Sequence, residues 1–137
     1  MLSGVTAAGA DPAPGAAAEQ ACTSYTHVGV GGGLHVPSLG PNSANYDCVV
    51  VWGRTGFPVL VLQESLNACY GQGLKPDSVF GDNTRKAVRN AQTRINQVHG
   101  SVLGVDGRFG PKTSSYFAFQ AYDHNNNGAQ TKSGSWW

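Results

Sequence analysis

Apolar residues recur at helical spacing through the second half of the chain. The first such segment carries Val59, Leu62, Leu66 and Cys69, at i, i+3, i+7 and i+10. This spacing places them on one face of a helix. Pro58 suits the first helical position because its missing N–H would be unpaired there anyway, and Gly71 follows the last apolar residue. The pattern predicts an amphipathic helix over residues 58–70.

Two further segments follow the same rule. The second repeats the spacing with Thr84, Val88, Ala91 and Ile95, and the third marks a face with Thr113, Phe117, Gln120 and Ala121. Asp82 opens the second segment, where a carboxylate favours the positive end of the helix dipole, and Gly110-Pro111 opens the third. We expect helices over residues 82–97 and from residue 111 to around residues 123–127.

A nine-residue phrase is duplicated ahead of these last two segments. "PDSVFGDNT" (residues 76–84) and "VDGRFGPKT" (residues 105–113) agree at an aspartate, a phenylalanine, a glycine and a threonine, 29 positions apart. The matching residues are Asp77, Phe80, Gly81 and Thr84 in the first copy and Asp106, Phe109, Gly110 and Thr113 in the second, which adds Gly107. Aspartate bonds its own downstream backbone in turns, and glycine reaches positive φ without steric cost. Each copy therefore predicts a turn, an inward-facing aromatic plug and a helix start.

The chain before residue 58 carries no helical periodicity. Residues 1–20 are rich in small residues, and Ala8-Gly9-Ala10 resembles a secretory cleavage site. A signal-peptide remnant and a flexible tail both remain open, and neither places folded structure there. Residues 21–47, with a glycine run within 29–33 and two prolines, predict a loop-rich extension. The β-branched stretch at residues 49–52 allows one short strand.

Composition narrows the classes of function. The 137 residues carry only 12% charged side chains and a formal net charge of +1. One small domain is expected, without the basic field that nucleic acid or an anionic membrane would need. No apolar run approaches the roughly 20 residues that cross a bilayer. The histidines and cysteines lack metal-ligand spacing, so we expect no metal and no cofactor.

Three cysteines predict one disulfide and one remaining thiol. We favour a Cys48–Cys69 pair because both residues flank the first compact element. The odd count keeps Cys22 open as a partner, and an intermolecular bridge as well. Alternatively, Cys69 is a reduced core residue, since it falls on the apolar face and buried thiols are common.

Catalytic interpretations of the duplicated phrase are weaker than the turn interpretation. A calcium loop needs oxygen ligands at alternate positions and a closing glutamate, but the copies place Val79-Phe80 and Arg108-Phe109 there. The carboxylates Glu64, Asp77, Asp82 and Asp106 show no sequence sign of converging for glycosidic cleavage. A Gly-x-Ser-x-Gly motif is absent. No catalytic residue is predicted.

These residues together resemble the peptidoglycan-binding domain type 1 family, a small three-helix module attached to many secreted cell-wall enzymes. The likeness spans about residues 48–122 and is carried by both copies of the phrase with Val59, Leu62-Gln63, Leu66, Ala87-Val88 and Gln92. The stretch "LNACYG" looks like secreted actinobacterial versions. The chain departs from the family at Asp77-Ser78, usually Asp-Gly, and at Ala91-Gln92, usually Phe-Gln.

The resemblance implies a mainly α fold, a three-helix bundle over residues 48–124 with a flexible tail over residues 125–137. It also implies a secreted, monomeric, non-catalytic protein whose partner is peptidoglycan, through its glycan strand or its stem peptide. Two other functions stay open. One is a small wall hydrolase with its nucleophile or carboxylates within residues 21–57. The other is an interaction or inhibitor protein on the same fold, with Cys22 or another free thiol tethering a partner.

Exposed candidates for ligand contact lie beside the turns. They are Tyr70, Arg85, Arg89 and Tyr116. Guanidinium groups would hold peptide carboxylates, and phenol rings would stack on sugars. Each has an ordinary alternative, a core rim for the tyrosines and a solvated helix face for the arginines. Trp136 and Trp137 offer further stacking faces or simply a tail tip.

Overall fold

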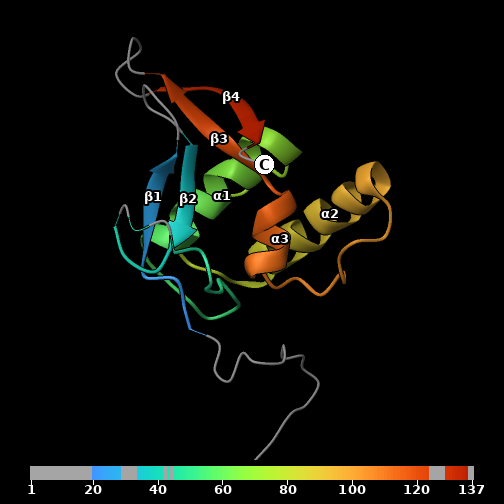
Figure 1. Ribbon diagram of the computed structural model, residues 1–137, viewed down its shortest axis with the longest axis horizontal. Helices are drawn as coiled ribbons and strands as arrows, with labels where there is room; N and C mark the ends of the chain where they lie inside the picture. The colour runs from blue at the N-terminus through green and yellow to red at the C-terminus, as the bar shows by residue number, and fades with distance from the viewer. Residues whose placement is uncertain (1–19, 29–33, 42, 44, 124–128, 136–137) are drawn as a thin grey trace, which may run out of the picture.

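The computed structural model describes residues 20–28, 34–41, 43, 45–123 and 129–135. The helices are α1 (Phe57–Tyr70), α2 (Asp82–His99) and α3 (Pro111–Tyr116). The strands are β1 (Ser24–Val28), β2 (Leu34–Ser38), β3 (Ala118–Asp123) and β4 (Ala129–Ser135). The four strands form one antiparallel sheet in the order β1-β2-β3-β4. Figure 1 shows α1 against this sheet, with α2 and α3 on the far side of the molecule from β1.

The first two predicted helices are confirmed to within two residues at each end. α1 ends at Gly71, whose φ of 63° lies in the left-handed region, and the Gly71 N–H donates to the Asn67 carbonyl. Three helices are thus present among the described residues. The four-stranded sheet was not expected from the sequence. The described fold is a helical unit joined to this sheet and not a helix bundle alone.

The predicted length of the third helix is wrong. α3 ends at Tyr116 because Phe117 adopts an extended conformation, with φ −82° and ψ 143°. Phe117 and Phe119 are both fully buried, with the half-buried Ala118 between them. This alternation has the period of a strand. The sequence predicted helix there because Phe117 and Gln120 also fit helical spacing.

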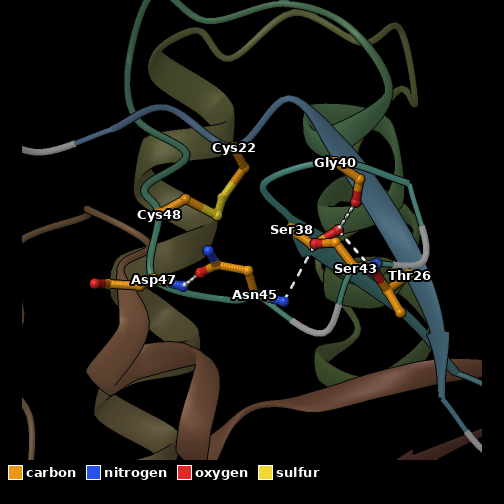
Figure 2. The surroundings of a disulfide bond; sticks show 8 residues. All are labelled: Cys22, Thr26, Ser38, Gly40, Ser43, Asn45, Asp47 and Cys48. Atoms are coloured by element: carbon orange, nitrogen blue, oxygen red, sulfur yellow. Dashed lines mark hydrogen bonds between the residues drawn. A yellow bond between two sulfur atoms is a disulfide. The ribbon is translucent and has the colours of Figure 1, made fainter.

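The stretch predicted as a loop-rich extension contains β1 and β2. These strands pair with Thr26 opposite Val36, and the buried Thr26 hydroxyl contacts the Ser38 hydroxyl at 2.8 Å (Figure 2). In place of the expected short strand, Val49 and Val50 form isolated bridges with Ala21 and Phe109. The glycine run within residues 29–33 lies outside the described residues.

A disulfide joins Cys22 to Cys48 (Figure 2), so the predicted Cys48–Cys69 pair is wrong. The parallel bridge between Ala21 and Val49 brings the two cysteines together, because the Cys22 N–H donates to the Val49 carbonyl at 2.9 Å. Cys69 is a half-buried thiol near the end of α1. The disulfide therefore closes the β1–β2 segment into a loop of the chain, which restricts the unfolded state.

The stretch predicted as a flexible C-terminal tail contains β4, which pairs with β3 from Ala118–Ser135 to Asp123–Ala129. Residues 124–128, Trp136 and Trp137 lie outside the described residues, as do residues 1–19 with the predicted cleavage site. The stacking role considered for the two tryptophans therefore stays a prediction.

One apolar core joins the helices to the sheet. Its largest fully buried members are Phe80, Phe109, Phe117, Phe119, Leu62 and Leu66. The ring centroids of Phe109 and Phe117 lie 5.0 Å apart in an edge-to-face arrangement, a favoured geometry for aromatic pairs. Phe80 and Phe109, one from each copy of the duplicated phrase, both face inward as predicted.

The described residues form neither a membrane-spanning helix nor a cluster of metal ligands. None of its helices is both long and apolar enough to span a bilayer. Nor do its histidine, cysteine, aspartate and glutamate side chains gather in threes as a metal ion would need.

Candidate ligand-binding groove

A buried glutamine of α1 holds the first copy of the phrase. Gln63 is 1% exposed. Its Nε2 donates to Asp77 Oδ1 at 3.1 Å, to the Val79 carbonyl at 3.0 Å and to Thr84 Oγ1 at 3.1 Å. Its Oε1 accepts the Ser78 N–H at 2.9 Å. Because an amide nitrogen carries two hydrogens, its three acceptors share them.

A second buried glutamine holds the second copy in the same way. Nε2 of Gln92, on α2, donates to Asp106 Oδ1, the Arg108 carbonyl and Thr113 Oγ1 at 2.9–3.1 Å. Its Oε1 accepts the N–H groups of Asp106 and Gly107, both at 3.0 Å. Gln92 lies 29 positions after Gln63, the spacing of the duplicated phrase itself. Each glutamine and the turn that it holds is called here a turn bracket, the first with Gln63 and the second with Gln92.

An asparagine one helical turn further on completes each bracket. Asn67 Nδ2 donates to the Leu74 carbonyl at 2.8 Å, and its Oδ1 accepts the Leu74 N–H at 2.6 Å. Asn96 makes the same pair of contacts with Leu103, at 2.9 Å each. The side-chain amides thus satisfy backbone groups that the turns would otherwise leave unpaired.

The two brackets carry different residue types at one position where both have a left-handed backbone conformation. Ser78 has a φ of 65° and Gly107, its counterpart, a φ of 77°. A Cβ built on Gly107 would lie 2.6 Å from Arg85 Cγ and 3.2 Å from the Arg85 carbonyl oxygen. The second turn therefore needs glycine, whereas the first turn tolerates serine in a left-handed conformation. The departure from Asp-Gly seen in the sequence does not change the turn.

The first bracket lowers the pKa of the Asp77 carboxyl through hydrogen bonds. The Val79 N–H donates to its Oδ1 at 3.0 Å. This bond and, next in size, the bond from Gln63 hold the pKa of the Asp77 carboxyl below its ordinary value. Hydrogen bonds to the ionised form of a carboxyl favour that form, so Asp77 is an ionised structural acceptor at neutral pH.

The first turn and the first half of α2 enclose a polar groove of about 710 Å³. Its lining is Gln63, Gln72, Gly73, Leu74, Lys75, Asp77, Val79, Gly81, Asp82, Asn83, Thr84, Lys86, Ala87 and Asn90. Asn90 Nδ2 donates to Gln72 Oε1 at 2.9 Å, which ties α2 to the turn. The groove is therefore open to solvent and is formed by the first bracket together with the first half of α2.

The charges around the groove are unequally engaged. Asp82 Oδ1 accepts the exposed Trp52 indole N–H at 3.0 Å and lies 3.5 Å from an Arg85 guanidinium nitrogen. Arg85 and Asp82 thus form an ion pair three residues apart on α2. Lys75 and Lys86 both line the groove, and neither lies within ion-pair distance of a described carboxylate.

The four ligand contacts predicted from the sequence do not form one site. Arg85 is half-buried against Asp82 and covers Gly107, while Arg89 is exposed on α2. Neither arginine lines the groove. Their role as ligand contacts stays a prediction.

Tyr70 and Tyr116 do come together, in a smaller hollow of about 200 Å³ beside Cys69, Arg94 and His99. The Tyr70 hydroxyl accepts the Ala118 N–H at 2.9 Å, and its ring lies 4.8 Å from that of Phe117. Burial raises the pKa of Tyr70 to about 12. Tyr70 thus packs at the core rim between α1 and β3, the alternative that the sequence left open for it.

Sequence reasoning missed the polar groove residues Gln72, Lys75, Lys86 and Asn90. A signal was available in the duplication. Their counterparts 29 positions later are Ser101, Gly104, Ser115 and Phe119. The bracket residues recur in both copies and the groove residues do not, so the positions that differ between copies mark the surface specific to the first.

Comparison with known proteins identifies the segment that carries both brackets. Residues 55–115 match the family model described as "Putative peptidoglycan binding domain". This segment belongs to that family. It contains the whole lining of the groove and all of both duplicated phrases. No curated protein and no solved structure matches the chain.

Proposed function

We propose that this protein binds bacterial peptidoglycan without cleaving it, and that the groove of the first bracket is the binding surface. One observation carries the proposal. The segment that belongs to the peptidoglycan-binding family also contains every residue that lines the groove. A preformed concave surface on which several polar groups converge is a common form of ligand site.

The charged groups of the groove support binding over hydrolysis. The two carboxylates in its lining, Asp77 and Asp82, are both engaged by hydrogen bonds within the protein. Asp77 is held ionised, whereas a general acid for glycosidic cleavage needs a raised pKa. The proposed setting is the cell wall outside the cytoplasm, in keeping with the Cys22–Cys48 disulfide.

Sedimentation with purified insoluble peptidoglycan tests the proposal. The protein is expected in the pellet, and it should release no soluble wall fragments. Protein that remains in the supernatant at every salt concentration contradicts the proposal, and fragment release supports the hydrolase alternative.

Matched variants locate the surface. Asn83→Trp places a bulky ring in the groove lining and is expected to reduce pelleting at least tenfold. Gln97→Trp makes the same change at an exposed α2 position outside the lining and should pellet like the parent. Arg85→Ala and Arg89→Ala test the earlier prediction. If both bind like the parent, the arginine assignment is wrong and the groove assignment stands.

A further inference from the structure

We propose that the groove recognises the stem peptide of peptidoglycan, through a peptide carboxylate held by Lys75 and Lys86, and not the glycan strand. This inference rests on the proposed function and names the part of the polymer that the groove contacts. Peptidoglycan offers two chemically distinct targets, neutral N-acetylated sugar rings and short peptides that bear free carboxylates. The groove can be compared with each.

The internal duplication separates structural from specific residues. Both brackets keep their glutamine, asparagine, aspartate, phenylalanine and threonine, and these make equivalent contacts. At the lysine positions of the first copy the second copy has Gly104 and Ser115. Because the second turn is held without these lysines, a bracket does not need them for its structure.

The ammonium groups of Lys75 and Lys86 are available to a ligand, because the carboxylates that line the groove have other partners. Asp82 is engaged by Trp52 and Arg85, and Oδ1 of Asp77 is engaged by Val79 and Gln63. Lys75 lies close enough to contribute to the lowered pKa of Asp77, but neither groove lysine forms an ion pair with a described carboxylate. An incoming carboxylate would therefore gain charge-assisted hydrogen bonds without displacing an existing ion pair.

The rest of the lining favours a peptide over a sugar. None of the described residues that line the groove has an aromatic ring, although such rings supply the flat faces on which sugars stack. The amide side chains Gln72, Asn83 and Asn90 line it instead, and each amide group can both donate and accept hydrogen bonds. Backbone amides of a peptide present the matching groups.

Trp52 is the feature that a glycan-binding groove would use. Its ring is 58% exposed, and its indole N–H is fixed by Asp82 at the edge of the groove. It belongs to the test as the competing contact. If the groove takes the glycan instead, removal of the Trp52 ring abolishes the binding of bare strands.

The experiment compares two soluble probes by titration calorimetry on the whole chain. One probe is a free stem peptide. The other is glycan strands freed of their peptides by an amidase, with the lactyl carboxylates that this cleavage exposes then amidated so that the strands are neutral. The peptide is expected to bind, with an affinity that falls as salt rises, and the bare strands are not. The same peptide with its carboxylates amidated should bind about tenfold more weakly.

Lysine variants identify the contact. Lys75→Ala and Lys86→Ala should each weaken peptide binding about fivefold, the effect of losing about 1 kcal/mol of charge-assisted bonding. Lys75→Arg and Lys86→Arg keep the charge and should retain most of the affinity. Lys112→Ala removes an exposed lysine of the second copy and serves as the matched control.

Each outcome separates this inference from the proposed function. The inference is overturned if bare strands bind and Trp52→Ala abolishes that binding, or if insoluble peptidoglycan pellets the protein but the lysine variants pellet like the parent. In both cases peptidoglycan binding itself survives. If neither the soluble probes nor insoluble peptidoglycan binds, the proposed function fails together with the inference.

Discussion

The two turn brackets share their internal hydrogen bonds and differ in the surface that they present. Gln63 and Gln92 each hold an aspartate, a backbone carbonyl and a threonine. The first bracket adds lysine and amide side chains around a groove, where the second has glycine, serine and phenylalanine. Within one chain, the shared residues thus report what a turn of this kind requires, and the unshared ones what the first turn does beyond folding.

A comparison of α2 with α3 shows where the duplication stops. Both begin after a phenylalanine and a glycine of the repeated phrase, yet α2 continues for 18 residues and α3 for 6. The spacing would place the next bracket glutamine at position 121, which is an alanine. With no third turn to hold, the chain leaves the helix at Phe117 and joins the sheet.

The largest expected effect is the loss of a bracket glutamine. Gln63→Leu and Gln92→Leu should each lower the free energy of unfolding by about 3–5 kcal/mol, because several buried donors and acceptors lose their partner at once. Gln92→Leu should cost more, since Gln92 Oε1 accepts two backbone N–H groups and Gln63 Oε1 accepts one. Urea denaturation measures both, with exposed Gln97→Leu as the control. A Gln63 variant that unfolds like the parent contradicts the equivalence of the brackets.

Gly107→Ala should lower the free energy of unfolding by about 2–3 kcal/mol. The added methyl group meets the Arg85 stem and backbone at a residue whose φ is 77°, and both steric overlap and left-handed geometry are unfavourable for alanine. Ser78→Ala at the matched position should change stability by less than about 0.5 kcal/mol. Equal losses for the two variants would show that the turns do not differ in packing as described.

Tyr70, at the end of α1, gives a pH test of the path that the chain takes from α3 into β3. Its folded pKa of about 12 lies above the ordinary value of 10, so the neutral phenol contributes stability that is present below pH 10. That stability is lost as the pH rises through 12. We expect the free energy of unfolding to fall by about 2–3 kcal/mol across this range.

Tyr70→Phe should remove that part of the pH dependence. Absorbance titration of the phenolate follows the ionisation directly. A Tyr70 that ionises near pH 10 would mean that β3 does not cover this end of α1 as the Ala118 contact indicates.

The smallest expected effect is a gain. Ser78→Gly should raise the free energy of unfolding by about 0.5–1 kcal/mol, because it relieves a left-handed conformation that glycine adopts freely. Thermal unfolding measures the change, and Gly81→Ser, at a neighbouring position with negative φ, controls for the exchange of the two residue types. A loss of stability on Ser78→Gly would show that the first turn has come to depend on its serine.

The fold was predictable wherever local chemistry decided it. α1 and α2 begin and end close to the predicted residues because their apolar spacing, Pro58 and Gly71 are local signals. The inward Phe80 and Phe109 follow from turns of the same kind. The sheet was missed because β1 and β2 come from a stretch of glycines and prolines. It was also missed because Phe117 fits helical spacing with Gln120 as well as strand alternation with Phe119.

The candidate site was predictable only in its scaffold. The sequence placed contacts on Tyr70, Arg85, Arg89 and Tyr116, which the structure distributes over separate surfaces. Apart from their absence from the second copy of the duplication, Lys75 and Lys86 carry no local pattern that sets them apart from other surface lysines. They became candidates once the fold had placed a turn and a helix on either side of one groove.

The sequence by itself determined the two turns, the helix starts after them and the family of residues 55–115, because each depends on residues that are neighbours along the chain or repeat at a fixed interval. Only the tertiary structure decided the Cys22–Cys48 pair, the end of α3 and the groove. The disulfide and the end of α3 depend on segments distant in sequence, which meet through burial of the common core. The groove depends on how the first turn folds against the helix that follows it, and no local propensity specifies such a meeting.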